Sequence, residues 1–214
     1  MPILFEINNF SERLYLQSIT LVTCFGVFSY DAASHQVSET PNANNIRNDL
    51  ADKKQLTPLW LAFSVGYELL FKSALSKHKA LTISKKNVSG HNSQIEAISR
   101  VYSYVQEAQV SAPADEYLRS QLNTQGISNL YDFSTGGLGS CRACLNKLLE
   151  RKLITSEEKD FLKDATQLLS DIRRNVDVHT FFGFTVGKSI YGDLENVYLP
   201  ALNLLLQVYW RPMA

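Results

Sequence analysis

The sequence predicts an all-α protein, an up-and-down helical bundle with an N-terminal helical extension. Apolar residues recur at helical spacing in several long segments. Two segments open with a capping box, Ser93-x-x-Glu96 and Thr155-x-x-Glu158, in which the side chains bind free backbone N–H groups at a helix start. No run of residues alternates between apolar and polar for long enough to be a convincing strand.

The N-terminal part, residues 1–56, is expected to hold one helix and a polar connector. Ser11 can cap a helix that runs to about Ser29. The stretch 31–55 is rich in Ser, Asn and Asp and is interpreted as a loop. The apolar residues of 14–28 are interrupted by polar ones and fall short of the roughly 20 that a membrane span requires. We therefore expect a buried amphipathic helix and no membrane partner.

The second part, residues 57–214, is expected to form the main bundle. Thr57 caps its first helix, Pro58 takes the first helical position, and the helix ends near Lys79. Asp193 is expected to cap the last helix, which Pro200 would kink or delay. The helices expected between these two cover residues 93–109, 113–122, 142–152 and 155–174.

Charge and cysteine content limit the classes of function. The chain has 214 residues and a formal net charge of zero, which argues against a general polyanion-binding protein but leaves room for a local basic site. An odd number of cysteines, three, and no basic residue before Arg13 favour a reducing compartment and a cytoplasmic location. Cys141 and Cys144 have the spacing of a metal or redox pair, but no second pair completes a zinc site. Buried helical thiols are favoured, and no metal or cofactor is expected.

One short segment carries residues suited to chemistry. The helix that opens at Thr155 is expected to end in Arg173 and Arg174, followed by Asn175 and, four residues further on, His179. These side chains would then lie at a helix C-terminus and in the turn beyond it, where they can converge. The alternative is a purely structural role, in which the cations cap the helix, since positive charge is favourable at its C-terminus.

The segment Arg174-Asn175-x-x-x-His179 resembles the motif of the HEPN superfamily, an Arg and a His separated by four to six residues, the first of them polar. The resemblance covers about residues 57–210. It implies a metal-independent endoribonuclease, a toxin or antiphage-defence effector, with Arg174, Asn175 and His179 as catalytic residues. It also implies a homodimer and a cognate antitoxin or regulatory protein. Phe181 stands where some toxins of the family carry a Tyr that an antitoxin modifies, so that mode of control is not expected.

The residue types fit RNA cleavage by attack of the 2′-hydroxyl on the adjacent phosphorus. His179, with an ordinary pKa of about 6.5, can exchange a proton near neutral pH. Arg174 can stabilise charge on the phosphoryl oxygens through bidentate hydrogen bonds, and Asn175 can orient the phosphate. One His serves poorly as both acid and base. The resemblance resolves this by pairing two copies around a composite site.

A basic segment could hold the RNA backbone. No acidic residue lies between Glu68 and Glu96. The candidate RNA-binding residues are Arg173, Lys72, Lys77, Lys79, Lys85 and Lys86. The alternative is a solvated helix end and loop. Glu68 itself is expected to pair with Lys72 or to contact the site.

The sequence leaves two other hypotheses open. The first is a non-catalytic HEPN module that binds nucleotide, RNA or a protein partner. The second is a helical dimerisation protein with a chance motif. An intact Arg–Asn–His set favours the enzyme.

Overall fold

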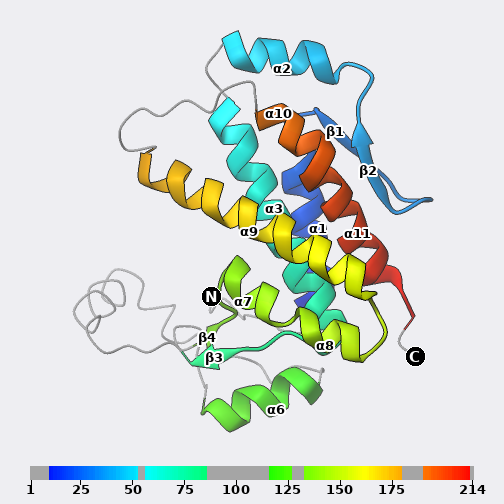
Figure 1. The fold of residues 1–214 in the computed structure, drawn as a ribbon, viewed down its shortest axis with the longest axis vertical. Coiled ribbons are helices and arrows are strands. Elements are labelled where there is room, and N and C mark those ends of the chain that lie inside the picture. Colours follow the sequence, from blue (N-terminus) through cyan, green and yellow to red (C-terminus); the bar gives the residue numbers. More distant parts are fainter. Residues whose placement is uncertain (1–9, 53–55, 86–115, 127–132, 180–189, 213–214) are drawn as a thin grey trace, which may run out of the picture. The chain divides into compact units, whose positions relative to one another are not determined.

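The computed structural model describes residues 10–52, 56–85, 116–126, 133–179 and 190–212 (Figure 1). The predicted all-α class is confirmed, with only two small two-stranded sheets among these residues. The described part divides into two compact units, one formed by 1–10 and 81–136 and the other by 11–80 and 137–214. The expected helix over 93–109 lies outside the described residues, and the expected division into 1–56 and 57–214 stays a prediction.

The described residues of the smaller unit form one helix and one short ladder. Helix α6 (Glu116–Gln125) presents Leu118 and Leu122, one turn apart, to Ile83. The side chain of Gln121 binds the backbone of Ile83 and of Leu81 at 3.0 and 2.9 Å. The ladder pairs β3 (Ser84–Lys85) with β4 (Phe133–Ser134) in antiparallel register.

The larger unit is built around α3 (Leu56–Lys77), which begins one residue before the predicted Thr57 cap. Its aromatic residues Trp60, Phe63, Tyr67 and Phe71 are buried. Helix α11 (Leu199–Trp210) packs along α3, and α9 (Ser156–His179) contacts both (Figure 1). The other helical elements described in this unit are α1 (Phe10–Thr23), α2 (Ala43–Asp52), α7 (Leu138–Ala143), α8 (Leu145–Glu150), α10 (Ile190–Asp193) and the π-helical turn η2 (Leu194–Tyr198).

The prediction that residues 31–55 form a polar loop is wrong for the residues of this stretch that the structure describes. They contain a hairpin and a helix. Strands β1 (Phe28–Asp31) and β2 (Gln36–Glu39) pair in antiparallel register. The Asp31 carboxylate accepts hydrogen bonds from the Ala33 N–H and the Ser34 hydroxyl at 2.9 and 2.6 Å, which closes the turn. Strand β2 is held on α11 because the Asn203 amide binds the N–H and the carbonyl of Val37 at 2.8 and 2.9 Å.

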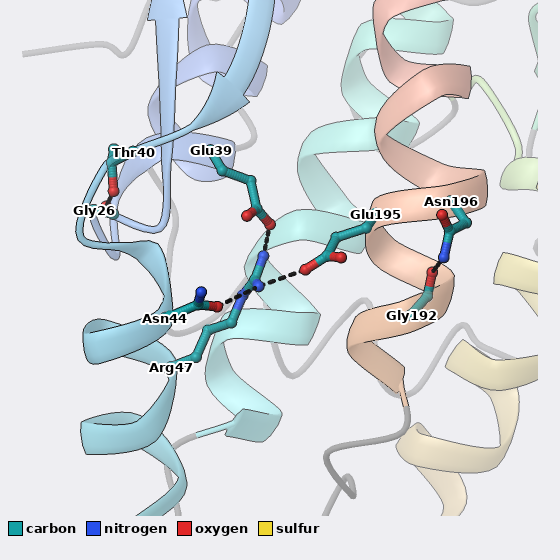
Figure 2. A network of polar contacts seen from close by, with 8 residues as sticks. All are labelled: Gly26, Glu39, Thr40, Asn44, Arg47, Gly192, Glu195 and Asn196. Carbon is teal, nitrogen blue, oxygen red and sulfur yellow. Dashed lines mark hydrogen bonds and ion pairs between the residues drawn. The ribbon is translucent and has the colours of Figure 1, made fainter.

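Helix α2 buries Ala43, Arg47 and Leu50, which lie at helical spacing. Arg47 is only 7% exposed and forms ion pairs with Glu39 of β2 and, at 2.5 Å, with Glu195 of η2 (Figure 2). A charged residue therefore occupies a position of the buried stripe. The sequence pattern looks too polar for a packed helix, and the connector prediction failed for this reason.

The last helix does not begin at a cap formed by Asp193. This residue has helical backbone angles and makes no side-chain capping hydrogen bond. The chain instead passes through α10 and η2 before α11 begins at Leu199. Pro200 has no N–H to donate one turn back, which agrees with the interrupted helical pattern just before it.

Candidate functional site

The start of α9 is fixed by the predicted capping box. The Thr155 N–H donates to Glu158 at 2.8 Å, and the Glu158 N–H donates to the Thr155 hydroxyl at 3.1 Å. Arg211, just beyond α11, binds both oxygens of Glu158 at 2.7 and 3.0 Å. Hydrogen bonding to Arg211 lowers the pKa of Glu158, although burial opposes this shift. The helix therefore has a fixed starting point against the end of α11.

The end of α9 differs from the prediction. We expected the helix to stop near Arg174, but it continues through His179. The reason is that no Gly or Pro stands between Ser156 and His179 to end it. The predicted catalytic residues Arg174, Asn175 and His179 thus share one helix instead of flanking its end. Their side chains lie outside the described part, and their convergence stays a prediction.

Backbone geometry sets how these positions are spaced. At about 100° per residue, residues 175 and 179 lie on the same side of a helix, one turn apart. Residues 174 and 179 differ by about 140° around the helix axis. The Asn and His positions of one copy are therefore neighbours, while the Arg position faces a different direction.

Arg173, the residue before the motif, is anchored to α3. Its guanidinium forms an ion pair with Glu68, and Lys72 binds the other oxygen of the same carboxylate at 2.5 Å. The side chains of Glu68, Lys72 and Arg173 are 14%, 11% and 30% exposed, so the cluster is largely shielded from water. The expected pairing of Glu68 with Lys72 is confirmed. The bridge to Arg173 was not predicted, because residues 105 positions apart meet only through packing of α3 and α9.

The remaining candidate RNA-binding lysines come from different elements of the chain. Lys77 is half-buried, with its ammonium 4.0 and 4.5 Å from the ring centres of Tyr209 and Trp210. Lys79 is exposed in the same unit, whereas Lys85 lies in β3 of the other unit. Lys86 lies outside the described residues.

Cys141 and Cys144 are buried thiols, as predicted, while Cys24 is exposed. Burial raises the pKa of Cys141 to about 12. This thiol is therefore protonated near neutral pH and is a poor nucleophile. In the described ranges, no group of three or more His, Cys, Asp or Glu side chains is placed to hold a metal ion.

A basic pocket that the sequence analysis missed lies where α7 and α8 pack on α9. Its volume is about 400 Å³. The lining residues are Gly139, Arg142, Ala143, Leu145, Asn146, Lys159 and Lys163. Two pairs at a spacing of four, Arg142 with Asn146 and Lys159 with Lys163, were the available signal. The second pair marks one face of α9, whereas Arg142 lies on α7 and Asn146 on α8. Only the packing of the three helices brings these residues together.

Comparison with protein-family models, with curated proteins and with solved structures gave no match. Among the described residues, no helix is long and apolar enough to cross a membrane.

Proposed function

We propose that the protein is a metal-independent endoribonuclease whose catalytic residues are Arg174, Asn175 and His179. The observation that carries this proposal is the location of the motif in the last two turns of α9, directly after an anchored residue. Arg173 is tied to Glu68 of α3, and the first turn of α9 is tied to Arg211. Catalytic side chains need a rigid supporting element, and α9 is held in its first turn and again at Arg173.

The proposed reaction uses only the chemistry of these side chains. The 2′-hydroxyl of the RNA loses its proton and attacks the adjacent phosphorus, and the 5′-oxygen of the next nucleotide leaves and gains a proton. His179 transfers a proton in one of these steps, and Arg174 stabilises the charge on the non-bridging oxygens. Asn175 orients the phosphate. The products carry a 2′,3′-cyclic phosphate and a 5′-hydroxyl.

A second copy of the chain supplies the other proton-transfer group in this proposal. The reaction needs a base and an acid on opposite sides of the phosphorus, and one imidazole reaches both poorly. A homodimer with His179 from each copy meets this need. The test mixes wild-type subunits with His179→Ala subunits in varied ratios. Cleavage that falls with the square of the wild-type fraction supports a site that needs both copies, and cleavage that falls in direct proportion to that fraction contradicts it.

The cleavage proposal is tested with purified protein and total RNA in the presence of EDTA. Wild-type protein is expected to cut, and His179→Ala and Arg174→Ala are expected to lose at least about 100-fold in rate. Lys152→Ala, which changes an exposed residue outside the motif, is the matched control and should cut at the wild-type rate. Equal cutting by all four proteins would place the activity elsewhere or in a contaminant.

The second candidate function, a non-catalytic nucleotide- or RNA-binding module, is favoured by the basic pocket between α7, α8 and α9. Three cationic side chains in one concavity suit an anionic ligand whether or not the motif is active. Binding of RNA or nucleotide by a folded, dimeric protein that cuts no RNA would support this function. The biological role, a toxin or antiphage-defence effector restrained by a partner protein, comes from the resemblance alone.

A further inference from the structure

The basic pocket is formed by three helices of one compact unit. Arg142 projects from α7, Asn146 from α8, and Lys159 and Lys163 from successive turns of α9. Figure 1 shows α7 and α8 lying against α9. The volume of the basic pocket, about 400 Å³, falls within the range of about 300 to 1,000 Å³ that is typical of small-molecule sites.

The lining of the pocket contains three positive charges and no carboxylate. Lys159 is 3.9 Å from Asp160, but that aspartate is 66% exposed, so the ion pair is weak. Within the described ranges, neither Arg142 nor Lys163 forms an ion pair. In a chain with a formal net charge of zero, this is a local concentration of positive charge. Like charges gathered in a concavity attract anions.

The mixture of groups favours a phosphate over a single carboxylate. A guanidinium binds two oxygens of a phosphate at once, and ammonium groups add point charges without directional demands. The Asn146 amide can donate a further hydrogen bond. Leu145 and Ala143 give the pocket an apolar part, against which a sugar or base can pack. An anion with several charges and a neutral organic part satisfies all these groups.

We propose that the pocket lined by Arg142, Lys159 and Lys163 binds the phosphate groups of a nucleotide, either free or within an RNA strand. This inference does not depend on the proposed cleavage, because no residue of the 174–179 segment lines the pocket. The two ligand sources share the same chemistry at the pocket. An RNA strand differs from a free nucleotide in carrying further phosphates that extend beyond the pocket.

Binding is measured by isothermal titration with ATP, inorganic triphosphate and a short single-stranded RNA. All proteins carry His179→Ala, so that the proposed active site does not consume the RNA. Arg142→Gln and Lys163→Gln are each expected to weaken binding about tenfold. Lys152→Gln is the control, because it removes an exposed lysine outside the pocket. Thermal melting establishes that every variant is folded.

Three outcomes decide the proposal. ATP and triphosphate bound at least as tightly as RNA, with the expected losses, identify a free nucleotide as the ligand. RNA bound more tightly and with a steeper dependence on salt identifies a nucleic-acid strand, because more phosphates are then neutralised. No binding of any probe by the folded protein, or an equal loss in Lys152→Gln, would overturn the proposal. Separately, protein with His179 intact that binds these probes but cuts no RNA would contradict the proposed function while leaving the pocket proposal standing.

Discussion

The guanidinium of Arg173 on α9 is bound by the carboxylate of Glu68 on α3, immediately before the Arg174-Asn175-x-x-x-His179 segment. Lys72 occupies the second oxygen of the same carboxylate. The side chain of Glu68 is 14% exposed, so this bridge is better shielded than a surface pair. It ties the helix that carries the proposed catalytic residues to the central helix of the larger unit.

The first prediction concerns this bridge as a positioning device. Glu68→Gln removes the charge that Arg173 and Lys72 share, so α9 loses a fixed point one residue before the motif. We expect the kcat of RNA cleavage to fall roughly 10- to 100-fold with a smaller change in KM. Lys72→Met leaves the bridge between Glu68 and Arg173 in place and should retain most of the rate. A Glu68→Gln protein that melts earlier but cuts at the wild-type rate would restrict the bridge to a structural role.

The second prediction concerns Arg47, which is 7% exposed, while its partners Glu39 and Glu195 are 31% and 42% exposed. Arg47→Met leaves two carboxylates that water can reach and places an apolar side chain in the buried stripe of α2. The double variant Glu39→Gln and Glu195→Gln instead leaves a buried guanidinium without its counterions. We expect urea denaturation to show the double variant as the less stable protein, by about 1 to 3 kcal/mol. If Arg47→Met were instead the less stable protein, the network would stabilise the fold chiefly through the arginine side chain.

The third prediction concerns the contact of α3 with α1 at Gly66. A Cβ atom there would lie 2.7 Å from Val22 Cγ2 and 3.1 Å from the Ser18 carbonyl oxygen. Alanine gains about 1 kcal/mol in helix propensity, but overpacking a core costs about 1 to 3 kcal/mol. Because one of the close atoms belongs to the backbone, we expect Gly66→Ala to be destabilising overall. Gly192→Ala in α10, where no atom lies within 4 Å of the added Cβ, is the control and should be neutral or stabilising in thermal melts.

The fourth prediction concerns His78, which is buried at the end of α3, with Nε2 2.6 Å from the Val208 carbonyl oxygen. Burial lowers the pKa of His78, the hydrogen bond to Val208 opposes the shift, and the positive charges of Lys77, Arg151 and Arg211 reinforce it. The unfolded chain therefore binds this proton more readily than the folded protein does. The stability contribution is complete above about pH 6.5 and is lost as pH falls toward the lowered folded pKa.

The measurement is the melting temperature between pH 5 and pH 8. The wild-type value is expected to fall as the solution is acidified through this range, and the value for His78→Gln to fall less. Parallel curves for the two proteins would contradict a role for His78 in this loss of stability.

Sequence reasoning worked where the determining interactions are local. The Thr155 and Glu158 capping box lies within four consecutive residues, and the structure has both of its hydrogen bonds. It failed for α2, because the buried position of Arg47 is stabilised by Glu39 and Glu195, which lie on other elements. The end of α9 was also predicted too early. Arg174 and Asn175 were interpreted as a helix terminus, although no helix-breaking residue follows them before Gly183.

The candidate site was predictable only as a motif. Its support from Glu68 and the basic pocket around Lys159 and Lys163 depend on α3, α7 and α8 packing against α9, which no single segment encodes. Pairs of polar residues four positions apart can be recognised in the sequence. The sequence does not show which helices these residues would face.

The central claim, cleavage of RNA by 2′-hydroxyl attack at the Arg174–His179 segment, is tested most directly by the ends of the products. Wild-type protein is incubated in EDTA with a labelled RNA and with the same RNA carrying a 2′-deoxy nucleotide at the cleaved position. The account predicts a 2′,3′-cyclic phosphate and a 5′-hydroxyl from the first substrate, no product from the second, and no product from either with His179→Ala. Products that carry a 5′-phosphate, or cleavage of the 2′-deoxy substrate, would contradict it.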